Sequence, residues 1–362
     1  MNPAFSPIAL SRRQAILIGG AAAMAPLSAC SAQPADQVTP TPRLETRGLD
    51  PTRMAATVTA AAALPRIRSL LVLRHGETLA EHRFNGDPPL ERPVNIKSAS
   101  KSVMSALVGV AIAKGVLTGA DQTVLSVLSA DAPANPDPRL GRLTIGDLLS
   151  MRSGLQRTSG EFYGRWVSSK NWVRYVLAQP FVDEPGGRMI YSTGNTHLLS
   201  AILTHASKRS SLALAREWLG GPLEITIPPW PADPQGVYFG GNDMLLSPRA
   251  LARFGELYRN DGRVVGAQVI PRDWIADSWT PRAVSPWSGN QYGYGWFIAQ
   301  VGEHPVRFGW GYGGQMVYVA PSLALTVVMT SVSTAARERD HIQSLHRLLS
   351  DGIIPAAALG AT

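Results

Sequence analysis

The sequence is poor in cysteine and lysine, and the shortage of cysteine excludes two kinds of structural site. Cys30 is the only cysteine in 362 residues, which excludes intrachain disulfides and zinc sites built from paired thiolates. The seven histidines include no pair with the H-E-x-x-H spacing of a metal site, so we expect neither a metal nor another cofactor. The net charge of +8 comes from scattered arginines, so we expect no nucleic-acid partner.

What the sequence does contain is enough apolar material for a large core. It is 45% hydrophobic and has nine tryptophans, a composition that is typical of globular proteins and excludes intrinsic disorder. A chain of this length forms one large domain or two lobes.

Residues 1–29 have the pattern of an export signal. Arg12 and Arg13 precede a short stretch rich in apolar residues, alanine and glycine, which is typical of twin-arginine signal peptides and too short to span a bilayer permanently. The stretch ends in Leu27-Ser28-Ala29-Cys30, which resembles the lipobox of bacterial lipoproteins. We therefore expect a periplasmic or cell-envelope lipoprotein that is held to the membrane through lipidated Cys30. An inert cysteine in an ordinary signal peptide is the alternative.

The rest of the chain divides into strand-rich ends and a helical middle. Residues 30–48, rich in Pro, Gln and Thr, are expected to form a tether. Apolar alternation predicts strands at 69–74, 78–84, 294–301, 306–310, 315–320 and 323–330. Helical spacing and capping residues predict helices at 52–63, 103–112, 143–151, 171–177, 198–204, 248–258 and 342–349. We therefore expect one domain over 49–355, with an α/β lobe from about 49–100 and 285–355 and an inserted α-helical lobe from about 101–284.

A serine and a lysine lie three residues apart at the start of the most apolar predicted helix. Ser98 would meet the unpaired N–H groups and the positive dipole end of this helix, both of which favour a developing anion. Lys101 lies one turn further on the same face. Ser100 has Val103 three residues on, so only Ser98 has an amine at this spacing. A serine that merely caps the helix is the alternative.

Two further stretches combine turn-forming glycines with functional side chains. Residues 185–195 place Tyr191 between a turn and a helix, and residues 309–315 lead through several glycines into a strand. Packing roles are the alternatives: a buried Tyr191, a turn at Tyr312-Gly313-Gly314 without a ligand role, and a hydrogen-bonded helical Asn195.

In this order and spacing, the three stretches resemble the serine β-lactamase and penicillin-binding-protein family. They are most similar to its class C-like branch of esterases, D-amino-acid peptidases and 6-aminohexanoate-oligomer hydrolases. Shorter stretches at 143–155, 233–236 and 292–296 resemble that branch too. The resemblance covers roughly residues 50–352 and implies an α/β (α+β), β-lactamase/transpeptidase-like fold. Its antiparallel sheet would be flanked by helices from both termini.

The resemblance also implies roles for individual residues. Ser98 would be the nucleophile, Lys101 the general base and Tyr191 the proton shuttle. The backbone N–H groups of Ser98 and Gln315 would bind the oxyanion. The remaining residues expected to bind substrate are Tyr312, Gly313, Gly314 and Asn195.

Two departures from the family pattern bear on the substrate. The second motif usually has Asn two residues after the Tyr, where this chain has Thr193, and Asn195 comes four residues after. The third motif usually begins with Lys or His, where this chain has Tyr312. Unless Arg307 substitutes for that cation, binding of a substrate carboxylate is weakened. We therefore expect a small-molecule ester or linear amide as substrate, hydrolysed through an acyl-enzyme.

Other functions stay open at this point. A β-lactamase or D,D-carboxypeptidase is the chemical alternative, and a non-catalytic peptidoglycan-binding envelope protein is the alternative from another class. A Ser-His-Asp triad is disfavoured because the chain has no G-x-S-x-G elbow. The sequence does not determine the oligomeric state.

Overall fold

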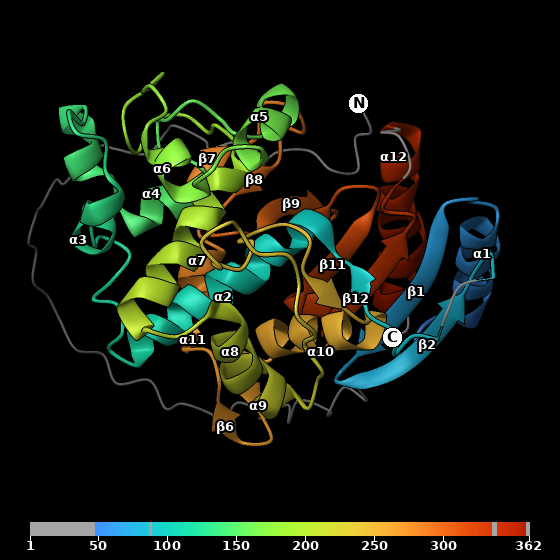
Figure 1. Ribbon diagram of the computed structural model, residues 1–362. Helices are drawn as coiled ribbons and strands as arrows, with labels where there is room; N and C mark the ends of the chain where they lie inside the picture. The colour runs from blue at the N-terminus through green and yellow to red at the C-terminus, as the bar shows by residue number, and fades with distance from the viewer. Residues whose placement is uncertain (1–47, 87–88, 335–338, 360–362) are drawn as a thin grey trace, which may run out of the picture.

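An eight-stranded antiparallel sheet forms one side of the molecule, shown in a computed structural model that describes residues 48–86, 89–334 and 339–359 (Figure 1). The predicted signal peptide, Cys30 and nearly all of the tether lie outside these residues. The strand order is β2-β1-β12-β11-β10-β9-β8-β7. The strands are β1 (Ile67–Arg74), β2 (Glu77–Arg83), β7 (Ala283–Val284), β8 (Gln291–Tyr292), β9 (Phe297–Val301), β10 (His304–Gly311), β11 (Gln315–Ala320) and β12 (Leu325–Ser331). Early and late segments of the chain therefore pair in one sheet.

The sequence of each strand matches its place in the sheet. Every residue of β11 and β12 is buried, as expected of strands covered on both faces. The edge strand β2 is polar and has no fully buried residue, which discourages further strand pairing. His75 and Gly76 join β1 to β2 with φ angles of 52° and 84°, the left-handed backbone of a tight hairpin turn.

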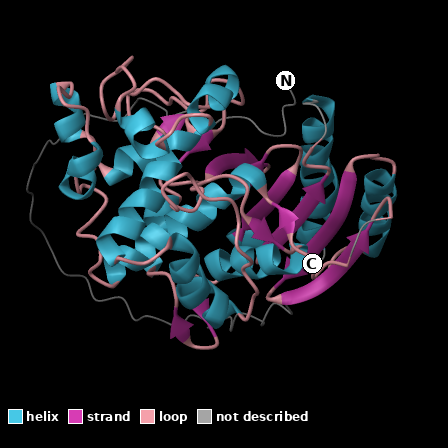
Figure 2. Ribbon diagram, in the orientation of Figure 1, coloured by secondary structure: helices cyan, strands magenta, loops and turns pink. Residues whose placement is uncertain are grey.

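Helices cover both faces of the sheet (Figure 2). Helix α1 (Pro51–Ala62), which is capped by Asp50, packs with α12 (Arg339–Arg347), the π-helical turn 348–353 and α13 (Ile354–Leu359) over one face. Helix α10 (Pro248–Arg259), capped by Ser247, packs on β1, β11 and β12. In the sequence, this helix lies within the stretch of about 101–284 that is expected to form the inserted lobe.

The inserted region is built around two long helices. Helix α2 (Ser100–Ala113) is buried from Ser100 to Ala111, and α7 (Thr193–Ser207) packs beside it (Figure 1). Around α7 lie α3 (Leu125–Leu128), α4 (Ile145–Leu149) and α6 (Trp172–Leu177). The shorter helices are α5 (Tyr163–Val167), α8 (Ser211–Ala215), α9 (Gly221–Leu223) and α11 (Arg272–Ser278), and β3 (Val94–Asn95) pairs with β4 (Leu245–Leu246). The predicted fold class is confirmed.

Two local differences from the sequence prediction concern the site. Ser98 does not begin the buried helix: it lies in a single 3-10 turn, Lys97–Ala99, directly before α2. The strand predicted to begin at Tyr294 begins at Phe297, because Gly295 has a φ of +77° and a side chain there would collide with the Lys101 carbonyl. Within the described ranges, no helix has the length and apolar character needed to cross a bilayer.

Candidate active site

The structure brings Ser98, Lys101 and Tyr191 together. Lys101 Nζ lies 3.1 Å from Ser98 Oγ, and the Tyr191 hydroxyl is close enough to Ser98 for the serine to lower the pKa of the phenol. The 3-10 turn and the first turn of α2 set the Ser98–Lys101 spacing. Tyr191 arrives from the segment before α7, more than ninety positions away in sequence.

Lys101 is buried inside the protein without an ion-pair partner among the described residues. Its Nζ donates to the Gly241 carbonyl at 2.6 Å and to Thr193 Oγ1 at 3.3 Å. Burial lowers the pKa of Lys101 from 10.5 to about 7, although the Asp243 carboxylate raises it. A substantial fraction of Lys101 is therefore a neutral amine near pH 7, the form that can accept a proton.

The three contacts of Lys101 also orient its lone pair. A neutral amine has two N–H groups and one lone pair, and a carbonyl oxygen can only accept. The Gly241 carbonyl therefore takes one N–H. Thr193 Oγ1 can accept a hydrogen bond from the second N–H, since its own hydroxyl can donate a hydrogen bond to Ser159 Oγ at 3.0 Å. The lone pair then faces the Ser98 hydroxyl, which is the arrangement of a base beside a nucleophile.

Tyr191 keeps its proton at neutral pH. Burial raises its pKa to about 12, although the nearby Ser98 side chain acts in the opposite direction. Lys101 Nζ lies 5.0 Å from the centre of the Tyr191 ring, and the partly exposed Trp287 packs edge-on at 5.3 Å. The phenol can therefore donate a proton to a group at Ser98 and accept one from it.

Strands β10 and β11 pack against the turn that carries Ser98. The approach is so close that a side chain at Gly311 would collide with the Ile96 carbonyl. Gln315 begins β11 opposite Gly311, and its buried side chain donates to the Ser331 carbonyl at 2.7 Å. Because that side chain is occupied, only the backbone of Gln315 could take part in oxyanion binding.

The glycines of the third stretch have a clear structural reason. Gly313 and Gly314 have φ angles of 78° and 98°, which favour glycine. A side chain at Gly314 would also come within 2.6 Å of Leu345 on α12. Tyr312, at the tip of the same turn, is 44% exposed and could contact a substrate without rearrangement.

The side chains of two residues considered for substrate binding are engaged with other parts of the protein. Asn195 is completely buried, accepts from Ser153 Oγ at 3.2 Å and lies 4.0 Å from Met151 Sδ. Arg307 donates to the Pro305 carbonyl and stacks on the Trp279 ring at 5.1 Å. Thr193, which occupies the position that is usually Asn in the family, does reach the cluster: its Oγ1 contacts Lys101.

The sequence pattern did not predict an ion pair that a second lysine, Lys97, forms beside the cluster. Lys97 Nζ forms an ion pair with Asp243 at 2.8 Å, and Asn95 donates to the same carboxylate at 2.7 Å. Lys97 and Ser98 are adjacent, but Asp243 comes from a distant loop. Thr193 was recognisable from its position after Tyr191, whereas nothing in the sequence pattern indicated Asp243, Gly241 or Ser159.

No histidine takes the place of Lys101. His197 is buried, but its Nε2 faces Asp233 Oδ2 at 3.1 Å and its Nδ1 faces the Gly240 N–H at 3.4 Å. Both ring nitrogens are occupied, so His197 is not available to deprotonate Ser98. In the part of the chain that the structure describes, no three His, Cys, Asp or Glu side chains are grouped to hold a metal ion.

Comparison with known proteins identifies the family and agrees with the fold. An antiparallel sheet covered by helices, with a Ser-Lys-Tyr cluster beside one strand, defines the class of β-lactamase-like and penicillin-binding-protein-like folds. The Beta-lactamase family model matches residues 68–349. The chain therefore belongs to the beta-lactamase family. A search of curated proteins found no match.

Several solved structures share the fold at low sequence identity. A candidate 6-aminohexanoate-dimer hydrolase from Bacillus anthracis superposes with a TM-score of 0.66 at 19% identity, covering 82% of this chain and 80% of that one. An octameric penicillin-binding protein homologue from Pyrococcus abyssi has a TM-score of 0.64 at 19% identity, covering 82% and 76%. EstCE1, a hydrolase with promiscuous acyltransferase activity, has a TM-score of 0.66 at 17% identity, covering 83% and 98%.

Proposed function

We propose that the protein is a serine hydrolase that cleaves an ester or a linear amide through an acyl-enzyme on Ser98. The observation that carries the proposal is the buried Lys101, whose pKa is lowered to about 7 and whose Nζ lies 3.1 Å from Ser98 Oγ. An amine with this pKa is a competent base near neutral pH.

The reaction follows from the hydrogen bonds. Lys101 takes the proton of Ser98 as Oγ attacks the substrate carbonyl carbon, and the carbonyl oxygen becomes an oxyanion. The backbone N–H groups of Ser98 and Gln315 stabilise it. Tyr191 donates a proton to the leaving oxygen or nitrogen as the bond to carbon breaks, and is reprotonated from Lys101. Water, deprotonated by the same pair, then hydrolyses the acyl-Ser98 ester.

The residues around Ser98 favour a substrate without a carboxylate. The third motif has Tyr312 where a cation is usual, and Arg307 is held against Trp279. The partly exposed aromatic side chains of Tyr312 and Trp287 suit an apolar acyl or leaving group. Among proteins of similar fold, a candidate 6-aminohexanoate-dimer hydrolase supports hydrolysis of a linear amide, and EstCE1, a hydrolase with promiscuous acyltransferase activity, supports acyl transfer.

Labelling with a fluorophosphonate probe tests the nucleophile. We expect the parent to react at Ser98 and Ser98→Ala to stay unlabelled, with p-nitrophenyl ester turnover lost in the same variant. Ser100→Ala is the matched control, because Ser100 Oγ donates to the Lys97 carbonyl, whereas Lys101 Nζ bonds to Ser98, Thr193 and Gly241; it should label normally. Equal labelling of parent and Ser98→Ala would refute the proposal.

A substrate panel separates the alternatives. A β-lactamase or D,D-carboxypeptidase would turn over nitrocefin or a D-Ala-D-Ala peptide faster than esters and linear amides. A non-catalytic envelope protein would turn over none of them. The panel should use residues 31–362, so that the predicted signal peptide does not interfere.

We also propose that the protein is exported by a twin-arginine signal and anchored to a membrane of the cell envelope through Cys30. The proposal rests on the arginine pair and the lipobox-like residues 27–30. Cys30→Ala should release the protein from the membrane fraction. An equally membrane-bound variant would refute lipid anchoring without affecting the proposed reaction.

A further inference from the structure

The Gly241 carbonyl that contacts Lys101 belongs to a loop, residues 230–241, that is held against helix α7. A side chain at either Gly240 or Gly241 would collide with Thr196 of α7, so the loop backbone lies directly on the helix. Ser200 of α7 donates to the Tyr238 carbonyl of the loop at 2.7 Å. The loop is therefore held on α7 at more than one point, and its Gly240–Gly241 end is the part that reaches Lys101.

A buried His-Asp pair links the two elements. His197 on α7 and Asp233 in the loop both have fully buried side chains. A carboxylate can only accept, so His197 Nε2 carries the proton and donates to Asp233. His197 Nδ1 is then an acceptor, and the Gly240 N–H donates to it at 3.4 Å. The pair thus holds the residue next to Gly241.

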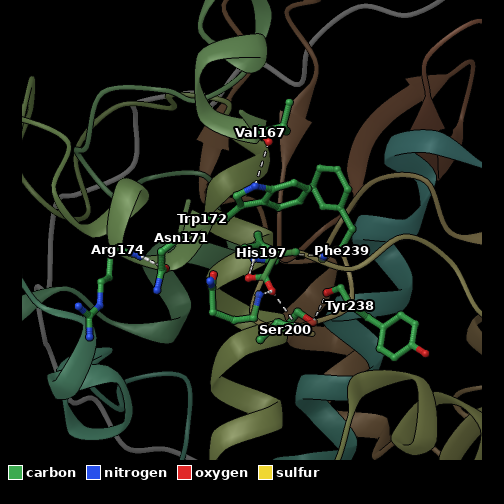
Figure 3. Close-up of polar contacts among 12 residues, drawn as sticks. Val167, Asn171, Trp172, Arg174, His197, Ser200, Tyr238 and Phe239 are labelled. Carbon is green, nitrogen blue, oxygen red and sulfur yellow. Dashed lines mark hydrogen bonds and ion pairs between the residues drawn. The ribbon is translucent and has the colours of Figure 1, made fainter. Parts of the chain in front are cut away.

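The surroundings keep the imidazole in one orientation. The rings of Trp172, Trp166 and Phe239 pack edge-on around it, with centroid distances of 5.3, 5.8 and 5.8 Å. Figure 3 shows His197 below Trp172 and Phe239, with Ser200 reaching toward Tyr238. Asp233 also accepts the N–H groups of Gln235 and Val237, each at 2.9 Å, so the carboxylate itself is fixed by the loop.

We propose that the His197–Asp233 pair positions the Gly241 carbonyl for Lys101 and thereby controls the rate of Ser98 acylation without touching the substrate. The inference rests on the proposed role of Lys101 as base. His197 is a positioning residue: it sets where the carbonyl lies, the carbonyl takes one N–H of Lys101, and the lone pair is left facing Ser98. Misplacing a catalytic contact by about 1 Å costs about a hundredfold in rate.

Two substitutions of His197 separate its two contacts. In His197→Asn the amide oxygen can occupy the position of Nδ1 and accept from Gly240, but the side chain is too short for Asp233. In His197→Gln the amide nitrogen can reach Asp233, but no acceptor faces Gly240. Ser200→Ala is the matched control, because it removes a hydrogen bond between α7 and the same loop at Tyr238, away from Lys101.

We expect His197→Gln to lower kcat about tenfold to a hundredfold with KM nearly unchanged. The acidic limb of its pH–activity profile should move to lower pH. The Gly241 carbonyl stabilises the ammonium form of Lys101 more than the amine, so displacing the carbonyl lowers the pKa of Lys101. His197→Asn should recover most of the rate, and Ser200→Ala should change it less than about threefold. The proposal is overturned if folded His197→Gln keeps the parent rate and pH profile, or if Ser200→Ala loses as much activity.

Asp233→Asn serves if His197→Gln does not fold. The new amide at position 233 can donate to His197 Nε2, so the ring proton moves to Nδ1, where it faces the Gly240 N–H. We therefore expect the same loss of kcat. An unchanged kcat counts against the proposal. Hydrogen exchange at Gly240 provides a readout besides activity. Its N–H should be protected in the parent and in His197→Asn and exchange faster in His197→Gln, and equal exchange in all three would overturn the contact. Failure of Ser98 labelling in the parent would instead refute the proposed function.

Discussion

Lys97 and Lys101 lie on either side of Ser98, yet their surroundings are opposite. The Lys97 side chain is 22% exposed and forms an ion pair with Asp243 at 2.8 Å. Lys101 is only 2% exposed and contacts a carbonyl and two hydroxyl oxygens, with no carboxylate in hydrogen-bond range. A charged Lys97 is compensated by its partner, whereas a charged Lys101 is opposed by burial.

The contrast shows what makes a lysine a base. Chemically identical side chains four positions apart differ in burial and in the nearest anion, and burial lowers the pKa of Lys101 to about 7. Asp243 connects the two, since its carboxylate pairs with Lys97 and raises the pKa of Lys101 from a greater distance. Neutralisation of Asp243 by Lys97 therefore helps to keep Lys101 neutral.

Substituting each lysine by arginine tests the contrast most strongly. Lys101→Arg introduces a guanidinium that stays protonated and cannot act as a base, so kcat/KM for an ester should fall about a thousandfold. Lys97→Arg is the matched control and should stay within about threefold, because it retains the ion pair with Asp243. Steady-state kinetics decide, and a Lys101→Arg variant with more than a tenth of the parent activity would contradict the assignment.

Tyr191 offers the next largest effect. Tyr191→Phe removes the proton that Ser98 and the leaving group share, so kcat should fall about a hundredfold. Tyr163→Phe is a suitable control: burial raises the pKa of Tyr163 to about 12 as well, but its hydroxyl accepts from Asn242 at 2.9 Å instead of meeting Ser98. If both variants lose activity equally, the effect is one of packing.

The charges around Asp243 should move the pH profile in opposite directions. In the parent, activity should rise with pH through about 7 as Lys101 loses its proton. Asp243→Asn removes the charge that raises the pKa of Lys101, so its acidic limb should move to lower pH. Lys97→Met leaves Asp243 uncompensated and should move the limb to higher pH. Measuring kcat/KM as a function of pH for the parent and both variants checks this. A shift of the acidic limb in the same direction in both variants would refute it.

The last prediction concerns stability instead of rate. The folded-state pKa of Lys101 is about 7 and the unfolded value is 10.5, so between these values the unfolded chain binds more protons and stability rises with pH. Lys101→Met lacks this contribution. The parent should therefore gain stability relative to the variant between pH 7 and pH 9.5, measured as the difference in urea midpoint. A constant difference would mean that Lys101 is not buried as a neutral amine.

Much of the fold could be predicted because its determinants are local. Asp50 caps α1 and Ser247 caps α10, as their sequence positions indicate, and the apolar alternation at 315–320 becomes the strand β11. The errors arose where tertiary contact overrides local pattern. The strand predicted from Tyr294 begins only at Phe297, because Gly295 packs so closely on α2 that a side chain there would collide with the Lys101 carbonyl. Helix α10 packs on the sheet although neighbouring segments belong to the inserted region.

The sequence by itself determined which residues could form the candidate site: the three-residue spacing selected Ser98 and Lys101, and the turn before a helix selected Tyr191. Only the tertiary structure decided how Lys101 is held and charged. Gly241 and Asp243 lie about 140 positions from Lys101 in the chain, and no local pattern specifies such neighbours. The physical reason is that a pKa depends on burial and on nearby charges, and both exist only after distant segments have packed together.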